Sequence, residues 1–216
     1  MLFDVNETLS DMSPLAGRFE DVGAPAHLAR TWFAELLRDG FALAACGAIE
    51  SFATLGAEAL RVRLHGHELN RSFDQAVEHV ISGFSGLEVH PDVPAGIRAL
   101  SDLDMRLVTL SNGSASVADA LLQGAGVRDH VERLLSVDDA GVWKPAAGAY
   151  AYALAECGVE PMDAMLVAAH PWDLEGARRA GLATVWLNRG KGVFPSYFRA
   201  PDIEVATLGE LAASLR

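Results

Sequence analysis

Two acids and one lysine lie where they could carry out nucleophilic chemistry. Asp4 ends a short apolar stub, Lys144 precedes a proline, and Asp173 follows the apolar run of residues 165–169. A carboxylate acts as a nucleophile when it is kept ionised and aimed, and a nearby ammonium lowers its pKa. We therefore expect Asp4 to be the nucleophile and Lys144 to hold it ionised. The alternative for Lys144 is a surface lysine beside a proline.

A second polar cluster, Ser111-Asn112-Gly113, follows the β-branched apolar run of residues 107–110. It offers a hydroxyl, an amide and free backbone N–H groups at the expected start of a helix. Such groups suit a substrate carboxylate or another small anion. The plainer interpretation is an ordinary helix N-cap, and both roles are compatible.

Two further candidate side chains lie shortly before Asp173, in the segment that follows residues 165–169. His170 either assists a water molecule or serves as a hydrogen-bonding spacer. Trp172 either walls a pocket or packs in the core. His65 and His67 fall at a polar helix end, so we expect both to be exposed.

The elements that position these residues are indicated by hydrophobic periodicity. Helical spacing predicts helices at 25–38, 49–64 and 73–82, with Asp39-Gly40 ending the first. Beyond Pro91, helices alternate with strands, which is typical of a parallel sheet built from βαβ units. The expected strands are 2–3, 106–110, 134–137, 165–169 and 184–187.

This pattern predicts an α/β protein with a doubly wound, Rossmann-like parallel sheet and an inserted helical cap. The core comprises residues 1–11 and 88–216, and the cap comprises residues 12–87. The carboxyl ends of the strands in such a sheet are where ligands bind. The first strand is short, which leaves room for residues upstream of Met1.

Four segments resemble the motifs of the haloacid dehalogenase superfamily, in the family's order. They are residues 3–9, residues 107–114, Trp143-Lys144-Pro145 followed by Tyr150, and residues 165–177. The resemblance covers nearly the whole chain and is closest to the type II, or L-2-haloacid, dehalogenases. Family phosphatases carry a second Asp in the first motif, where this chain has Asn6. An amide cannot protonate a leaving group, which favours carboxylate attack on something other than a phosphate ester.

The resemblance implies a two-step hydrolysis of small 2-haloalkanoic acids. Asp4 attacks C2 and expels halide, and water then hydrolyses the aspartyl ester, with Asp173 orienting or deprotonating that water. The implied catalytic residues are Asp4, Thr8, Lys144, His170 and Asp173. The implied substrate-binding residues are Asn6, Arg30, Phe33, Phe52, Ser111, Asn112, Tyr150 and Trp172.

The expected cap departs from the family in one respect. Family dehalogenases carry an Arg directly after a Trp on the first cap helix, and it holds the departing halide. An ungapped match places Phe33 there, and a guanidinium and a phenyl ring are not interchangeable. One alternative is that Arg30 or Arg38 substitutes for the missing Arg. Another is that aromatic edges of Phe33, Phe52 and Trp172 hold the leaving group, and a third is that no halide is released. The plainer alternative is that both arginines are solvated.

Composition bounds the partners and the location. The chain has 216 residues, half of them hydrophobic, and a net charge of −12, which argues against nucleic acid. It contains no apolar run of membrane-spanning length and no secretion signal at its start, so we expect a cytoplasmic protein. Cys46 and Cys157 are expected to be buried free thiols. We expect a small-molecule carboxylate as substrate, and a homodimer is left open.

We expect no cofactor and no metal. Two alternative functions remain at this stage. One is a Mg²⁺-dependent phosphatase or phosphonatase of the same superfamily, which Asn6 disfavours. The other is a catalytically silent protein that binds small anions.

Overall fold

Six parallel strands form the single sheet of the protein in the order β3-β2-β1-β4-β5-β6. The computed structural model describes residues 1–216, with the side chain of Ser85 excepted. The strands are β1 (Leu2–Phe3), β2 (Val108–Ser111), β3 (Arg133–Ser136), β4 (Met165–Ala168), β5 (Ala183–Leu187) and β6 (Ile203–Val205). The order reverses at β1, as in Rossmann-type sheets, and this confirms the predicted doubly wound α/β fold.

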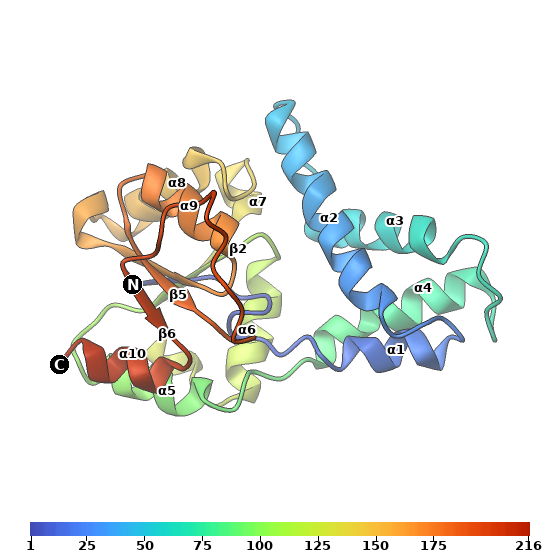
Figure 1. The fold of residues 1–216 in the computed structure, drawn as a ribbon, viewed down its shortest axis with the longest axis horizontal. Coiled ribbons are helices and arrows are strands. Elements are labelled where there is room, and N and C mark those ends of the chain that lie inside the picture. Colours follow the sequence, from blue (N-terminus) through green and yellow to red (C-terminus); the bar gives the residue numbers. More distant parts are fainter. The chain divides into compact units, whose positions relative to one another are not determined.

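Helices cover both faces of this sheet (Figure 1). They are α5 (Val93–Ser101), α6 (Ala115–Gly124), α7 (Val137–Ala140), α8 (Ala147–Cys157), α9 (Pro171–Arg179) and α10 (Leu208–Ser214), with 3₁₀ turns η2 (Arg128–His130) and η3 (Pro161–Asp163). Side chains alternate between faces along each strand. Val167 therefore packs with α5 and α10, whereas Leu166 and Ala168 pack with α8 and α9.

The chain divides into two compact units. Unit 1 comprises Met1–Ser10 and Glu88–Arg216, and contains the sheet. Unit 2 comprises Asp11–Leu87 and is helical. Its elements are α1 (Leu15–Asp21), α2 (Leu28–Ala45), α3 (Phe52–Leu64), α4 (Phe73–Ser82) and the 3₁₀ turn η1 (Gly83–Gly86).

Aromatic side chains form the centre of unit 2. Trp32 is fully buried, and its ring centroid lies 6.0 Å from that of Phe19 and 5.5 Å from that of Phe84. The Trp32 indole N–H donates to the Gly56 carbonyl at 2.9 Å and so ties α2 to α3. A Cβ at residue 56 would lie 3.2 Å from Leu36, so a glycine there lets the two helices approach closely.

The predicted end of the first cap helix at Asp39-Gly40 is wrong. Helix α2 runs on to Ala45, with Gly40 buried within it. Cys46 is the C-cap residue, and Gly47 then takes a φ of 73°, the left-handed conformation that favours glycine. An isolated glycine inside a helix is tolerated when its neighbours pack well.

Several short elements have no counterpart in the prediction, among them the seven residues of α1 and the three of β6. Periodicity needs longer windows than these elements provide. The predicted burial of the cysteines is also wrong, because Cys46 is exposed and Cys157 is half-buried. Among the described residues, no helix combines the length and the apolar character that crossing a membrane requires.

Candidate active site

The candidate site lies at the carboxyl ends of the central strands of unit 1. Asp4 follows β1, the strand between β2 and β4, and its backbone N–H donates to the Val167 carbonyl at 3.1 Å. His170 comes two residues after β4 and opens α9, and Asp173 lies in the first turn of that helix. Lys144 comes from the loop between α7 and α8.

An ammonium group lies between two carboxylates. Lys144 Nζ donates to Asp4 Oδ1 at 2.9 Å and to Asp173 Oδ2 at 2.6 Å, and all three side chains are buried. Burial by itself would lower the pKa of Lys144, but the charges of Asp173 and Asp4 raise it above its ordinary value. The structure thus brings the expected nucleophile and the expected cation into direct contact.

The same contact keeps Asp4 ionised. Burial alone would raise the pKa of the Asp4 carboxyl, but Lys144 and then His170 outweigh this and hold the pKa well below its ordinary range. Burial raises the pKa of Asp173, and the Lys144 ammonium only partly offsets this effect. Of the two carboxyl groups, Asp4 therefore has the lower pKa and stays ionised to lower pH.

The second oxygen of Asp4 also has partners. The Thr8 hydroxyl donates to Asp4 Oδ2 at 2.7 Å and accepts from the backbone N–H of Ala169 at 2.9 Å. Thr8 thereby links the loop after β1 to the end of β4. The Thr8 carbonyl in turn accepts from Arg189 Nη2 at 2.9 Å, and Arg189 Nη1 donates to Asp92 at 2.5 Å.

His170 bridges two acids. Its Nδ1 lies 3.0 Å from Asp4 Oδ2, and its Nε2 lies 2.8 Å from Glu7 Oε2. Burial alone would lower the pKa of His170, but hydrogen bonds to Asp4 and Glu7 raise it to about 9. Its ring also contacts that of Trp172, with centroids 5.1 Å apart. Near neutral pH, His170 is therefore an imidazolium beside the Asp4 carboxylate.

Tyr150 lies behind Asp173. It has no exposed surface, and its hydroxyl donates to Asp173 Oδ1 at 2.5 Å. Burial and the charge of Asp173 raise its pKa well above the ordinary value. Gly176 of α9 makes this contact sterically feasible, because a Cβ there would lie 2.5 Å from the Tyr150 hydroxyl and 2.7 Å from Pro145. Tyr150 therefore contacts Asp173, and the contact with substrate that the resemblance implies stays a prediction.

The Ser111-Asn112 cluster binds backbone. Asn112 Oδ1 accepts from the Lys144 backbone N–H at 2.9 Å, and its Nδ2 donates to the Lys144 carbonyl at 3.3 Å. Ser111 Oγ accepts from the Gly113 N–H at 2.9 Å, whereas the N-cap of α6 is Ser114. The amide of Asn6 lies near Gly113, where a Cβ would be 3.7 Å from Asn6 Nδ2. Asn112 thus holds the Lys144 loop at the end of β2.

The remaining expected residues belong to unit 2. Phe33 is buried on α2, and its ring centroid lies 6.4 Å from that of the half-buried Phe52 on α3. Arg30 is exposed, and Arg38 is paired with Asp39 at 2.8 Å. The role of these residues beside Asp4 stays a prediction. His65 and His67 are exposed, as predicted.

A divalent cation does not fit this arrangement. The Lys144 ammonium lies between the two carboxylates that would have to bind the ion, and Asn6 replaces the acid that would complete the set. Among the described residues, no three His, Cys, Asp or Glu side chains are grouped as a metal site requires.

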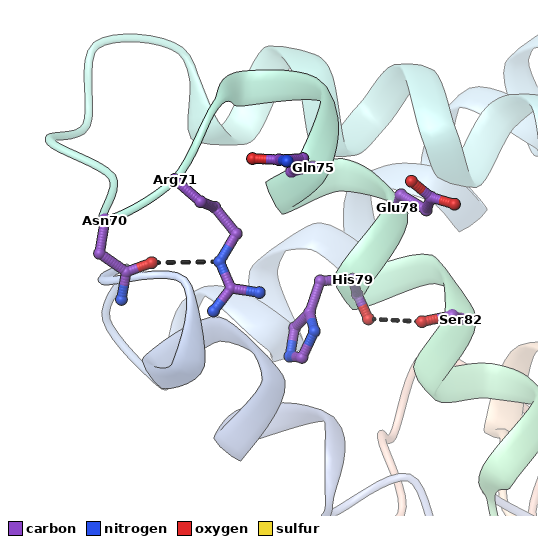
Figure 2. A pocket seen from close by; sticks show the side chains of 6 residues that line it. All are labelled: Asn70, Arg71, Gln75, Glu78, His79 and Ser82. Atoms are coloured by element: carbon purple, nitrogen blue, oxygen red, sulfur yellow. Dashed lines mark hydrogen bonds between the residues drawn. The ribbon is translucent and has the colours of Figure 1, made fainter.

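A pocket of about 600 Å³ lies within unit 2. Figure 2 shows the side chains that line it. It is lined by Asn70, Arg71, Gln75, Glu78, His79 and Ser82, none of which is an expected site residue. The His79 ring is hydrogen-bonded to Asp21 at 3.0 Å, and Arg71 donates to the Asp21 carbonyl at 2.6 Å. These contacts hold α4 and the preceding loop to the end of α1, which is a structural role.

Two residues that contact the candidate site, Glu7 and Arg189, were not expected there from the sequence. Glu7 falls inside the first motif, directly between Asn6 and Thr8. The sequence does not show that this acid faces His170, so its type alone was the available signal. Arg189 follows β5, where a polar residue after an apolar strand is the same signal that identified His170.

Comparison with known proteins places the chain in a family. Residues 1–181 match the model of the haloacid dehalogenase-like hydrolases. An (S)-2-haloacid dehalogenase of Pseudomonas sp. strain YL is 30% identical over 95% of this chain and 89% of that protein. The (S)-2-haloacid dehalogenase 4A of Burkholderia cepacia is 29% identical over 97% of this chain and 91% of that protein.

A solved structure of a dehalogenase with an intermediate complex is 27% identical, with a TM-score of 0.91. The superposition covers 99% of this chain and 95% of that one. The chain therefore belongs to the haloacid dehalogenase-like hydrolases, as its motifs indicated.

Proposed function

We propose that this protein is a hydrolytic dehalogenase of small 2-haloalkanoic acids. The observation that carries the proposal is the buried Asp4 carboxylate, which is held ionised by the Lys144 ammonium 2.9 Å away at the carboxyl end of a central strand. Its similarity to (S)-2-haloacid dehalogenases over nearly its whole length supports the choice of substrate.

In the first step, an Asp4 oxygen attacks C2 of the substrate in line with the carbon–halogen bond. The C–O bond forms as the C–halogen bond breaks, so halide leaves and Asp4 becomes a neutral ester. The Lys144 ammonium and the Thr8 hydroxyl, both hydrogen-bonded to Asp4, aim the carboxylate. Attack from the side opposite the halide inverts the configuration at C2.

In the second step, water adds to the Asp4 ester carbonyl, and the 2-hydroxy acid leaves. The sum of both steps is haloacid plus water giving hydroxy acid, halide and one proton. Asp173, which also binds Lys144, orients or deprotonates this water, and Tyr150 holds Asp173 from behind. The backbone N–H groups after β2, in the Ser111-Asn112-Gly113 segment, are the proposed site of the substrate carboxylate.

Unit 2 is the proposed cap, with Phe33 and Phe52 as candidates for contact with the leaving group. We propose that the reaction uses no metal and no cofactor, because an ammonium already neutralises the two carboxylates. A cytoplasmic location and a homodimeric state stay predictions of the sequence.

Halide release tests the proposal. The protein should release halide from bromoacetate, chloroacetate or 2-chloropropionate, and Asp4→Asn should abolish this because an amide is a poor nucleophile. A single turnover in ¹⁸O-water should place label in Asp4 before label appears in the product. A folded protein that releases no halide from any of these acids would overturn the assignment, and label that enters only the product would exclude the covalent route.

A further inference from the structure

The segment that carries Asp4 makes a tight turn before the chain leaves unit 1 at Ser10. The backbone N–H groups of Leu9 and Ser10 donate to the Val5 carbonyl at 2.9 and 3.0 Å. Thr8 lies in this turn with no exposed surface, and its hydroxyl donates to Asp4 Oδ2 at 2.7 Å. The position of the Thr8 backbone therefore sets where this donor lies relative to Asp4.

One guanidinium group holds the Thr8 backbone. Arg189, the second residue after β5, donates to the Thr8 carbonyl through Nε at 3.1 Å and through Nη2 at 2.9 Å. Its third nitrogen, Nη1, donates to Asp92 Oδ1 at 2.5 Å. An ammonium group would supply a single point charge instead of this planar fork, so the contact uses the geometry that distinguishes arginine from lysine.

Asp92 fixes the guanidinium in turn. Its Oδ2 accepts from the backbone N–H of Leu208, the first residue of α10, at 2.9 Å. Asp92 is also the N-cap residue of α5, but its side chain makes no cap hydrogen bond to that helix. The side chains of Arg189 and Asp92 are only 14% and 20% exposed, so their charge-assisted hydrogen bond is largely shielded from solvent.

The same two segments of unit 1 meet at a second point. Ser10, at which the chain leaves unit 1, pairs with Val89 of the returning segment in an isolated antiparallel bridge. Arg189 joins these segments again by binding Thr8 of the first and Asp92 of the second. The turn that carries the Asp4 partner is therefore fixed both where it ends and in its interior.

We infer that Arg189 is a positioning residue for the first step, because it holds the Thr8 carbonyl and thereby fixes the hydroxyl that aims Asp4 at C2 of the substrate. The inference rests on the proposed function. Asp92 keeps the guanidinium in place, and Thr8 transmits its position to the Asp4 carboxylate. A misplacement of about 1 Å at the reacting atoms can cost roughly 10²-fold in rate, so a contact this remote from the substrate can control the reaction.

The plainer alternative is that Arg189 only stabilises the fold. Arg189→Met would then slow the reaction because it leaves the largely buried Asp92 carboxylate without its partner and so destabilises unit 1. Adding Asp92→Asn separates the two roles, because the amide still accepts from the Leu208 N–H but carries no charge. A purely structural effect should be relieved in Arg189→Met/Asp92→Asn, whereas a positioning effect should persist.

Single-turnover halide release from 2-chloropropionate, with protein in excess, measures the first step. Arg189→Met should slow it roughly 10²-fold, while the protein concentration that gives half the maximal rate stays nearly unchanged. Arg189→Met/Asp92→Asn should regain stability in chemical denaturation and stay slow.

Arg98→Met is the matched control. Arg98 also donates to two backbone carbonyls, those of Pro94 at 3.3 Å and Gly126 at 3.0 Å, but it lies exposed on α5 and should leave the rate unchanged. Circular dichroism shows which variants fold. If Arg189→Met does not fold, Arg189→Lys takes its place, because an ammonium still pairs with Asp92 but offers the Thr8 carbonyl no fork.

A double-mutant cycle with Thr8→Val tests the route from Arg189 to Asp4. Valine keeps the shape of threonine but lacks the hydroxyl, so Thr8→Val should itself slow single-turnover halide release. If Arg189 acts through this hydroxyl, adding Arg189→Met to Thr8→Val should slow the reaction by less than about threefold more, far less than it slows the unmodified protein. A general loss of stability would not produce this dependence on Thr8.

Three outcomes would overturn the role of Arg189 while leaving the proposed function intact. One is a normal rate of halide release in the folded Arg189 variant. Another is recovery of the rate together with stability when Asp92→Asn is added. The third is a double variant with Thr8→Val in which the two losses multiply, because the residues would then act independently. An unmodified protein that releases no halide overturns both the role of Arg189 and the proposed function.

Discussion

The Lys144 ammonium has no exposed surface, so its charge is compensated entirely inside the protein. Its partners are Asp4 at 2.9 Å and Asp173 at 2.6 Å. Removing one member of a buried ion pair leaves uncompensated charge, which typically costs about 3–5 kcal/mol of stability. Compensation of this kind holds the Asp4 carboxylate ionised.

This geometry predicts the effect of Lys144→Met on the pH profile. Lys144 lowers the pKa of Asp4, so the active carboxylate is present above that low pKa and is lost only as the pH falls through it. Without the ammonium, burial raises the pKa of Asp4, and the acid limb of the rate profile should move to higher pH. The rate should also fall, as measured by initial rates of halide release across a pH series.

Lys191→Met is the matched control, since Lys191 is exposed and lies outside the network. It should leave the profile unchanged. If the acid limb of Lys144→Met coincides with that of the unmodified protein, Lys144 does not set the ionisation of Asp4.

At the scale of elements, the site depends on how closely α9 approaches the loop after Lys144. A Cβ on Gly176 would lie 2.5 Å from the Tyr150 hydroxyl and 2.8 Å from the Pro145 carbonyl, which is closer than real Cβ atoms come. Gly176→Ala should therefore push α9 away, disturb the contact of Asp173 with Tyr150 and lower both activity and stability. We expect a loss of about 1–3 kcal/mol, because overpacking typically costs this much.

Gly124→Ala is the control for helix propensity, because Gly124 ends α6 and a Cβ there would meet nothing within 4 Å. It should leave the free energy of unfolding unchanged or raise it by up to about 1 kcal/mol. Chemical denaturation of both variants measures the difference. Equal stability of the two variants would contradict the close approach of α9.

The sequence predicts the strands and helices that position the site, but it does not predict the long-range contacts that hold the site together. Four or five β-branched and apolar residues in succession are a strong signal for a buried strand. The runs before Ser111 and His170 carry this signal, and the structure has strands there. Glu7 and Arg189 escape prediction since their roles arise from contacts across the fold, such as Arg189 with the Thr8 carbonyl. Tyr150 is identified by its motif, but only the structure shows that it faces Asp173.

At the scale of the whole molecule, the charge arrangement predicts how the activity responds to metals. The net charge is −12, so the surface as a whole attracts cations, yet the two carboxylates of the site are occupied by Lys144. Halide release should therefore be insensitive to EDTA and unaffected by added Mg²⁺. Asn6→Asp adds the missing acid and should create at most weak, Mg²⁺-dependent hydrolysis of an aryl phosphate. A strict requirement of the unmodified protein for Mg²⁺ would contradict the proposed chemistry.

The proposed role of unit 2 as the cap predicts the leaving-group preference. Fluoride and chloride carry more concentrated charge than bromide and need strong hydrogen-bond donors, whereas aromatic edges suffice for polarisable bromide. If Phe33 takes the place of the Arg that family dehalogenases carry, as the ungapped match predicts, bromide should be released faster than chloride, and chloride faster than fluoride. Phe33→Arg should then raise chloride release relative to bromide release, if unit 2 presents residue 33 to the substrate.

Ala34→Arg is the matched control, because Ala34 is the exposed neighbour of Phe33 on α2. An arginine at residue 34 adds the same charge, but its direction from the helix axis differs from that of residue 33 by about 100°. Phe33 is only 5% exposed, so circular dichroism must first show that Phe33→Arg still folds. Arg30→Ala supplies a test that leaves Phe33 intact. This variant should reduce chloride release only if Arg30 binds the departing halide in place of the family's Arg. If Phe33→Arg and Ala34→Arg give the same ratio of chloride to bromide release, and Arg30→Ala changes nothing, α2 does not form the halide site.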